Sequence, residues 1–227
     1  MISGWALGSK LLGRVIWKGG TKESVPNVTC GNHTPISFSA MSQFRVLDVG
    51  GNEGERAYEF YPQTTDLRVV DIKYGWDVME KGLPYGPWEV ILANHFIEHI
   101  INPDYFLEEC KRAMEPHTIL DIGTPNLTAW FNRILFLFGY VPHSVELSTK
   151  FNVGKPFNWG KEPLGGHIRI FTLDALLELL DHHGFNVISV EGEASTYPTI
   201  LPIRWLDSLL TYISPTLASA FRVKCTL

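Results

Sequence analysis

The sequence has 227 residues, and 45% of them are apolar, so the chain is long enough to bury the core of one sizeable domain. Its 19 basic and 24 acidic residues give a net charge of -5, and no run of Lys or Arg forms a phosphate-binding stripe, which argues against duplex nucleic acid as a substrate. Cys30, Cys110 and Cys225 lie far apart without metal-ligand spacing, so neither a disulfide framework nor a zinc knuckle is expected. A reducing, cytoplasmic setting fits these observations best.

Residues 1–43 are predicted to form an N-terminal helix and an arm outside the main domain. Residues 1–17 have an amphipathic pattern with two basic residues and lack the unbroken apolar stretch of a signal peptide. Residues 18–43 are rich in turn-forming residues and have no sustained period. The longest apolar run covers residues 134–141, far short of the roughly 20 residues of a membrane-spanning helix, so no such helix is expected.

Residues 44–227 are predicted to form one α/β domain. Apolar strands alternate with helical patterns along this region, and that order favours a mostly parallel sheet with helices on both faces. Ligands of such sheets bind beyond the carboxyl ends of the strands, so the polar residues at those ends are candidates for the site. The predicted strands cover 45–49, 67–70, 88–93, 118–122 and 185–190, and the predicted helices cover 53–61, 103–114 and 173–183.

Two further segments complete the domain. Residues 125–166 exceed the length of an ordinary connection and are predicted to form an insertion or cap over the active site. A helix is expected over 203–213, with contact to a membrane surface or to a second copy as alternatives, followed by an edge strand over 221–225. The insertion holds many aromatic residues, which could wall a pocket but are mostly expected to pack in the core: Trp130, Phe131, Phe136, Phe138, Tyr140, Phe151, Phe157 and Trp159.

A glycine-rich turn follows the first strand. Gly50, Gly51 and Gly54 allow a sharp turn and a close approach of the backbone to a ligand, but the Lys and Ser or Thr of a phosphate-loop NTPase are missing. Asp48 and Glu53 would repel a pyrophosphate, whereas they suit a ligand with an ammonium and a sulfonium, such as S-adenosylmethionine. A nicotinamide dehydrogenase remains an alternative for this turn.

Asp71 lies 17 residues beyond Gly54, at the end of the second strand, where a carboxylate accepts hydrogen bonds from ribose hydroxyls. With this residue, Val46–Gly54 and Arg68–Asp71 resemble the first and second motifs of class I S-adenosylmethionine-dependent methyltransferases that act on small molecules. The resemblance covers about residues 45–195. It implies a Rossmann-like, seven-stranded, mostly parallel sheet with an antiparallel last strand. The family usually has a glycine at the position of Asn52, and Asn tolerates the same left-handed backbone angles.

The resemblance also implies which residues hold S-adenosylmethionine. Residues 76–78 stand where the family contacts adenine, and Asn94 stands where the fourth strand opens onto the methyl group. The predicted cofactor-binding residues are Asp48, Gly50, Gly51, Asn52, Gly54, Asp71, Ile72, Asp77, Val78 and Asn94.

Histidines gather at the expected mouth of the pocket. Methyl transfer to a hydroxyl needs a base for the proton, and His99 and His167 are the leading catalytic candidates, with His95 as a third. The alternative is that Glu98 and the histidines only fix the loops there. His95, Glu98, His99 and His167 also resemble the metal-binding cluster of small-RNA 2′-O-methyltransferases and of some quinone-biosynthesis O-methyltransferases, so a metal is a further alternative, weakened by His at the first position.

The sequence therefore predicts a methyltransferase that acts on a small molecule, a glycan or a lipid-like precursor, with oxygen as the preferred acceptor atom. The two alternatives are a metal-assisted O-methyltransferase acting on a catechol-like or ribose hydroxyl, and a non-catalytic module that binds S-adenosylmethionine. A homodimer is compatible with the pattern of the C-terminal helix.

Overall fold

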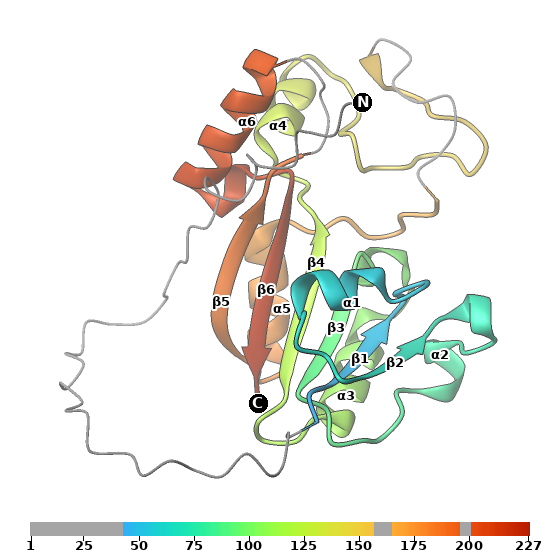
Figure 1. Ribbon diagram of the computed structural model, residues 1–227. Helices are drawn as coiled ribbons and strands as arrows, with labels where there is room; N and C mark the ends of the chain where they lie inside the picture. The colour runs from blue at the N-terminus through green and yellow to red at the C-terminus, as the bar shows by residue number, and fades with distance from the viewer. Residues whose placement is uncertain (1–42, 157–164, 196–200) are drawn as a thin grey trace, which may run out of the picture.

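The computed structural model describes residues 43–156, 165–195 and 201–227, so the predicted N-terminal helix and nearly all of the arm lie outside the described residues. Figure 1 shows one sheet with helices on both faces, which confirms the predicted Rossmann-like α/β class. The strands, in chain order, are β1 (Arg45–Val49), β2 (Asp66–Val70), β3 (Val90–Asn94), β4 (Ile119–Pro125), β5 (Asn186–Glu193) and β6 (Ala220–Thr226).

The sheet has the order β2-β1-β3-β4-β6-β5. Strands β2, β1, β3 and β4 are parallel, and β6 runs antiparallel to both of its neighbours, as predicted for the last strand. The predicted count of seven strands is wrong, because the described residues form six. The segment between β2 and β3 contains three glycines and two prolines and forms short helical turns, since proline and glycine interrupt a hydrogen-bonded ladder.

The predicted edge position of the last strand is also wrong. Strand β6 lies between β4 and β5, and β5 forms the edge of the sheet. Phe221, Val223 and Cys225 are fully buried, which is expected of an inner strand with a covered face. The sequence pattern of a short alternating strand does not distinguish these two positions.

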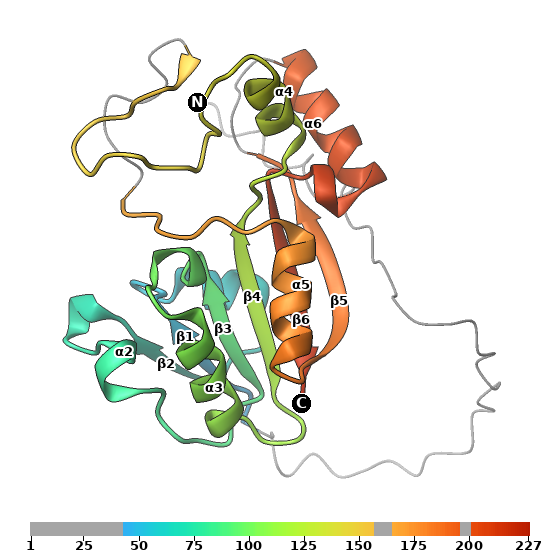
Figure 2. The same ribbon diagram turned by 180° about the vertical axis from the view of Figure 1, so that it is seen from behind.

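Helices cover the two faces of the sheet unequally. In Figure 2, α3 and α5 lie across one face, and α1 covers part of the other face in Figure 1. No helix of the described segments is long and apolar enough to cross a membrane. The α-helices are α1 (Glu55–Phe60), α2 (Val78–Lys81), α3 (Pro103–Ala113), α4 (Trp130–Leu137), α5 (Leu173–His182) and α6 (Leu201–Ile213), and short 3-10 turns cover η1 (Ile72–Tyr74), η2 (Ile97–His99) and η4 (Pro215–Leu217).

Alternating side chains of each strand supply two cores. On β3, Ile91 and Ala93 join the large core under α3 and α5, whereas Val90 and Leu92 join a smaller core with Ala57 of α1. All of these residues are fully buried. A period of two thus directs successive residues of one strand to opposite helical layers.

The register of the sheet gathers the polar strand ends at one edge. Val49 of β1 pairs with Val70 of β2, so the glycine turn and Asp71 leave the sheet side by side. Asn94 of β3 pairs with Gly123 of β4 in the same way. Candidate site residues from three strands therefore meet at the carboxyl edge, where parallel α/β sheets bind their ligands.

Beyond this edge, α4 and α6 form a separate pole of the molecule, seen at the top of Figure 1. The Trp130 indole of α4 donates a 2.7 Å hydrogen bond to Asp207 of α6, which joins the two helices. The expectation that the aromatic residues of the insertion mostly pack in the core is wrong for several of them. Phe157 and Trp159 lie outside the described residues, and the exposed aromatic residues are Phe136, Phe138, Tyr140 and Phe151.

A buried charged network ties the sheet to α1. The Arg222 guanidinium of β6 donates to the fully buried carboxylate of Asp121 on β4, and Tyr61 donates to the same carboxylate at 2.6 Å. Arg222 also donates to Glu193 of β5 and to Asn94 of β3. The Arg222 side chain therefore links its own strand to three others, β3, β4 and β5, on the face that α1 covers only in part.

We expect Arg222→Met to lower the free energy of unfolding by about 3–5 kcal/mol, because it leaves the Asp121 carboxylate buried without its main positive partner. The double variant Asp121→Leu/Arg222→Met is expected to recover most of that loss, because both charges are then removed. Urea unfolding followed by circular dichroism measures both effects. Arg56→Met is the control: Arg56 pairs with Glu59 on the surface, and its loss is expected to cost less than about 1 kcal/mol.

Candidate active site

The glycine turn between β1 and α1 adopts the backbone that the sequence predicts. Gly50, Asn52 and Gly54 have positive φ values of 71°, 51° and 77°. Asn52 thus takes the left-handed conformation in place of a glycine, at the cost of some strain that Asn tolerates better than most residues. The Gly50 amide donates to the Val70 carbonyl at 2.8 Å and fixes the start of the turn against β2.

Asp71 stands beside this turn, at the end of β2. One of its carboxylate oxygens accepts a hydrogen bond from the Asn52 amide at 3.2 Å, and the other accepts one from the Lys73 amide at 2.7 Å. The Lys73 ammonium in turn donates to the Asn52 side chain at 2.7 Å. These bonds hold the carboxylate at the turn and leave it further lone pairs for hydroxyl donors.

Asp48 is the unusual carboxylate of the site. It is fully buried beneath the turn, and neither of its oxygens has a hydrogen-bond partner among the described residues. Burial, with a further contribution from the charge of Asp71, raises the pKa of Asp48 to about 6. A Cβ atom on Gly51 would lie 2.1 Å from an Asp48 oxygen, so only glycine fits above this carboxylate. An orphaned buried carboxylate under an open glycine turn fits a ligand that carries an ammonium group.

A cavity of about 740 Å³ opens along the edge of the sheet beside Asp71. Five predicted cofactor-binding residues from the turn, the β2 end and the start of α2 line it, together with the predicted catalytic residues His95 and His99. Asp77, one of them, also caps α2 by accepting from the Met79 amide at 2.8 Å, which sets its carboxylate at the wall. The cavity is lined by Gly50, Val70, Asp71, Ile72, Trp76, Asp77, Val78, Met79, His95, Phe96, His99, Ile100, Ile101, Asn102, Tyr105 and Ile168.

The other predicted cofactor residues do not line this cavity. Asp48 lies beneath the turn, and Gly51, Asn52 and Gly54 shape the turn itself. The Asn94 side chain accepts a 2.9 Å hydrogen bond from Arg222, so it joins the buried network of the sheet. Sequence reasoning missed several other residues that line the cavity, because they are ordinary apolar or helix-capping residues without a motif. These residues are Phe96, Ile100, Ile101, Asn102, Tyr105 and Ile168.

Glu98 is the structural hub of the histidine cluster. Its side chain is fully buried, and its carboxylate bonds to His95 Nδ1 at 3.0 Å and to the Thr124 hydroxyl of β4 at 3.0 Å. Its backbone carbonyl accepts hydrogen bonds from the amides of Ile168 and Arg169, at 2.8 and 3.0 Å. Glu98 therefore fixes the loop after β3 against both β4 and the distant segment that carries His167.

His95 is held by this hub in a strained backbone conformation, with φ of 54°. Its amide donates to the Gly123 carbonyl at 2.8 Å, and its ring lies against Glu98. Left-handed residues other than glycine and asparagine are uncommon and concentrate at functional sites. His95 lines the cavity but contacts neither of the other two predicted catalytic histidines in any ring pair of the described residues.

His99 and His167 are 68 positions apart in the sequence and form a ring pair with centroids 4.8 Å apart. His99 Nδ1 bonds to the Gly166 carbonyl at 3.3 Å, and His167 Nδ1 bonds to the Ser144 carbonyl at 2.9 Å. Because a carbonyl only accepts, both Nδ1 atoms carry a proton, and Nε2 is the atom of each ring that is left to act as a base or a ligand. One ligand atom from each ring and one from Glu98 lie within 4.8 Å of one another.

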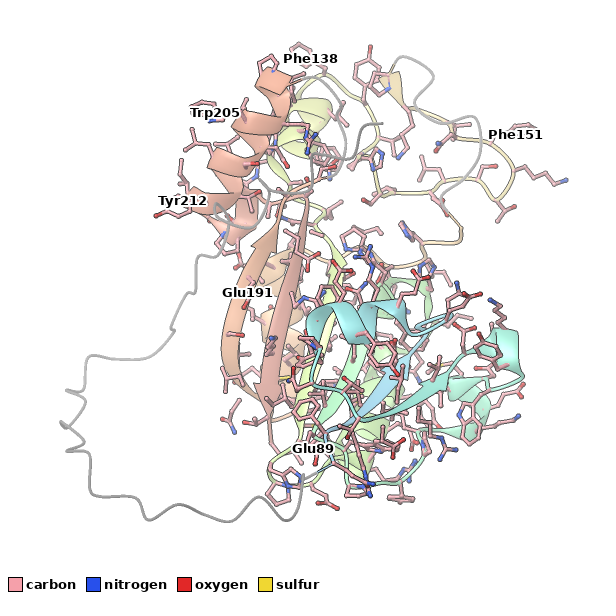
Figure 3. The ribbon with its side chains drawn as sticks, in the orientation of Figure 1. Glu89, Phe138, Phe151, Glu191, Trp205 and Tyr212 are labelled. Atoms are coloured by element: carbon pink, nitrogen blue, oxygen red, sulfur yellow. The ribbon has the colours of Figure 1, made fainter. Side chains whose placement is uncertain are left out.

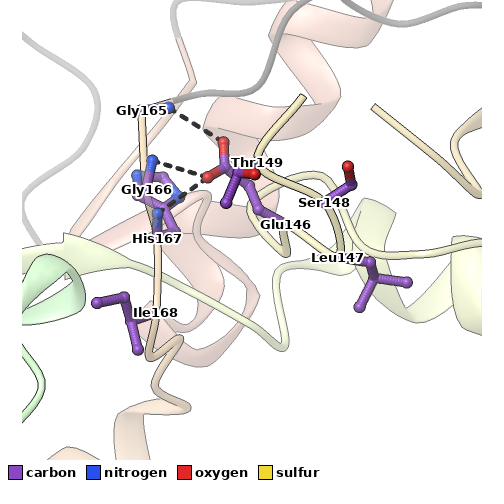
Figure 4. Close-up of a pocket in the computed structure, with 8 residues that line it drawn as sticks. All are labelled: Glu146, Leu147, Ser148, Thr149, Gly165, Gly166, His167 and Ile168. Atoms are coloured by element: carbon purple, nitrogen blue, oxygen red, sulfur yellow. Dashed lines mark hydrogen bonds between the residues drawn. The ribbon is translucent and has the colours of Figure 1, made fainter. Parts of the chain in front are cut away.

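A second cavity, of about 530 Å³, is lined by His167 (Figure 4). Its wall is organised by Glu146, whose carboxylate accepts hydrogen bonds from the amides of Gly165, Gly166 and His167. Ile168 lines both cavities, so the two open next to each other. The lining residues are Glu146, Leu147, Ser148, Thr149, Gly165, Gly166, His167 and Ile168.

A sequence profile of a family described as a methyltransferase domain matches residues 22–190. The chain belongs to this family. The methyltransferase uses S-adenosylmethionine as its cofactor, in agreement with the acidic glycine turn.

Solved structures agree on the fold. A candidate methyltransferase from Bacillus halodurans is 13% identical with a TM-score of 0.51, over 83% of this chain and 94% of that chain. An S-adenosylmethionine-dependent methyltransferase from Archaeoglobus fulgidus is 18% identical with a TM-score of 0.47, over 82% and 86%. At 13% identity, the Bacillus halodurans structure supports the fold and says nothing of the acceptor. No curated protein sequence matches the chain.

We expect Asp48→Asn to weaken S-adenosylmethionine binding by about tenfold or more, because a charged hydrogen-bond partner of the ammonium is lost. The same change is expected to stabilise the cofactor-free protein at pH 7.5 by about 2 kcal/mol. The sign follows from the raised pKa: ionised Asp48 disfavours the folded state, and this penalty grows as pH rises from 3.8 to about 6. At pH 4.5, the advantage of Asn is therefore expected to fall by at least half.

Isothermal titration calorimetry measures the affinity, and urea unfolding at the two pH values measures the stability. Asp181→Asn is a matched control, because Asp181 is exposed at the end of α5. Unchanged affinity in Asp48→Asn, or a stability gain that does not depend on pH, would contradict the role assigned to Asp48.

Proposed function

We propose that the methyltransferase transfers its methyl group to an oxygen atom of a small molecule, a glycan or a lipid-like precursor held in the cavity beside Glu146. The observation that carries this proposal is the position of the histidine pair. His99 lines the cavity of the glycine turn, His167 lines the neighbouring cavity, and their rings touch at the boundary. A base at that boundary can take a proton from an acceptor hydroxyl while the acceptor faces the cofactor.

In this proposal, the cavity beside Asp71 binds the cofactor and the cavity beside Glu146 binds the acceptor. S-adenosylmethionine supplies an electrophilic methyl group on a sulfonium, and Asp71, Asp77 and the glycine turn are the residues that would hold it. The cavity beside Glu146 offers the side chains of Leu147 and Ile168 together with the Ser148 and Thr149 hydroxyls. This mixture suits an acceptor with an apolar part and hydroxyl groups.

The histidine pair has the hydrogen bonds of an oriented base. Each Nδ1 proton is donated to a backbone carbonyl, which fixes the tautomer and directs Nε2 away from the backbone. Glu146 binds the amides around His167 and thereby fixes the ring from the other side. His167 is the residue that we assign as the proton acceptor, because it lines the acceptor cavity, and His99 positions it through the ring contact.

We expect His167→Gln to reduce kcat at least about a hundredfold, the usual contribution of a general base, while the affinity for S-adenosylmethionine changes little. His99→Gln is expected to lower kcat by a smaller factor. The assay incubates the enzyme and methyl-labelled S-adenosylmethionine with fractionated cell extract, identifies the labelled product, and then measures kcat on that acceptor. His182→Gln is the control, since its side chain is 73% exposed at the end of α5.

A methylated nitrogen or carbon in the labelled product would contradict the oxygen assignment. Full activity of His167→Gln on the identified acceptor would contradict the assigned base. The cofactor affinity of each variant, measured separately, keeps these outcomes apart from a simple loss of folding.

A second candidate function is metal-assisted methylation of a catechol-like or ribose hydroxyl. It is favoured by the grouping of Glu98, His99 and His167, whose ligand atoms lie within 4.8 Å of one another. Both histidines donate their second nitrogen to a carbonyl, as metal-binding histidines commonly do. Glu98 opposes this assignment in part, because both of its carboxylate oxygens already have hydrogen-bond partners.

Metal content and chelation distinguish the two candidates. If a metal assists the reaction, the purified enzyme contains about one equivalent of a divalent ion, which His167→Gln loses, and chelation abolishes activity until the ion is returned. A base mechanism predicts full activity after chelation. Elemental analysis by mass spectrometry and an activity assay with and without chelator provide the measurement.

A further inference from the structure

Helix α6 carries its apolar side chains on the outside of the molecule. Trp205, Tyr212 and Ile213 are 68%, 52% and 61% exposed, and Leu209 lies between them on the same helical face. The opposite face buries Asp207 and Thr211. An ordinary surface helix has the reverse arrangement, with its apolar stripe facing the core. The exposed face of α6 therefore has the composition of a contact surface for a partner that is less polar than water.

Helix α4 beside it has the same inversion. Phe136, Leu137 and Phe138 at its end are 56%, 80% and 70% exposed. Asn132 is fully buried, and its side chain donates to the Asn126 carbonyl and accepts from the His143 amide. Polar side chains thus help to fasten the two helices to the molecule. Leu135 of α4 is also buried, but many of the other apolar side chains face outward.

These side chains form what we call the apolar pole. In Figure 3, Phe138, Trp205 and Tyr212 project away from the body of the protein at the end formed by α4 and α6. Monomeric soluble proteins rarely expose a large apolar patch, and such patches mark contacts with membranes or proteins. The apolar pole consists of Ile134, Phe136, Leu137, Phe138, Trp205, Leu206, Leu209, Tyr212 and Ile213.

The exposed charged residues of α4 and α6 are all positive. Arg204 of α6 is exposed, and so is Arg133 of α4, whose guanidinium also donates to the Thr128 and Thr216 carbonyls. Asp207, the acidic residue of α6, is buried and accepts hydrogen bonds from the Trp130 indole and the Ser195 amide. Along α4 and α6, the exposed charges are therefore positive, in a chain with a net charge of -5.

We propose that the apolar pole docks the enzyme onto the surface of a lipid bilayer that contains anionic lipids. Exposed Trp, Tyr and Phe side chains favour the boundary between lipid headgroups and acyl chains, and exposed arginines add attraction to anionic headgroups. A second copy of the chain fits the pole less well. In a symmetric contact between two such faces, Arg133 and Arg204 would meet no exposed carboxylate of α4 or α6 with which to pair.

The pole lies at the same end of the sheet as the candidate active site. Strand β4 carries Thr124, which bonds to Glu98, and the chain continues from β4 into α4. Docking at the pole therefore places the carboxyl edge of the sheet toward the membrane. If the proposed function holds, the acceptor is an amphiphile that reaches the histidine pair from the bilayer surface.

The test is cosedimentation of the full chain with vesicles, without cofactor or acceptor. Vesicles of phosphatidylcholine alone are compared with vesicles of equal parts phosphatidylcholine and phosphatidylglycerol. We expect binding to the anionic vesicles that weakens as salt is raised. The variant Leu137→Ser/Phe138→Ser/Trp205→Ser is expected to bind about tenfold more weakly, and Arg204→Glu is expected to lose the preference for anionic lipid.

Two controls match these changes. Tyr58→Ser removes an aromatic side chain that is 53% exposed on α1, and Arg56→Glu reverses an exposed charge on the same helix. Both are expected to bind like the unaltered protein. Circular dichroism and thermal unfolding establish that each variant is folded.

Absence of vesicle binding by the unaltered chain would overturn the proposal, and so would undiminished binding by the folded triple variant. A concentration-dependent dimer that the triple variant abolishes, without any binding to vesicles, would assign the pole to a second copy and overturn it as well. Because vesicle binding is measured without methyl transfer, failure of this inference is distinct from failure of the proposed function.

Discussion

The candidate active site depends on the hydrogen bonds of one buried residue, Glu98. Its carboxylate joins His95 to Thr124, and its backbone carbonyl receives the amides of Ile168 and Arg169. The side chains of His99 and Arg169 add bonds to the Gly166 and Ile101 carbonyls between the loop after β3 and the segment that returns from the insertion. A buried carboxylate is costly unless its oxygens are satisfied, so the same bonds that satisfy Glu98 also force the two segments together. The meeting of His99 with His167 is the consequence.

Asp121 and Asp48 are both buried acidic residues, but they differ in whether their carboxylates have hydrogen-bond partners. Asp121 is satisfied by Arg222 and Tyr61 and serves the fold. Asp48 is equally buried and has no hydrogen-bond partner in the described structure, so its charge costs free energy until a cation arrives. If Asp48 binds the ammonium of the cofactor, as predicted, the glycine turn gives up stability in return for affinity.

Helices α4 and α6 also bury polar side chains, and this affects the surface of the molecule. Their buried faces use Asn132 and Asp207 as hydrogen-bonding anchors, which leaves many apolar residues of both helices facing out. Sequence periodicity alone indicates an amphipathic helix over 203–213, but it does not tell which face is buried. The expectation that most aromatic residues of the insertion pack in the core was wrong for this reason: hydrogen bonds from buried polar side chains decided the orientation instead.

The sequence by itself determined the alternation of strands and helices, the acidic glycine turn and the position of Asp71 at the end of β2, because each depends on neighbours within one β-turn-α unit. The backbone preference of Asn also predicted the left-handed conformation of Asn52. Only the tertiary structure decided the inner place of β6, the number of strands, the orphaned state of Asp48 and the pairing of His99 with His167. These features depend on contacts between segments far apart in the chain, and residue spacing holds no information about which of two distant loops a buried carbonyl or carboxylate will bind.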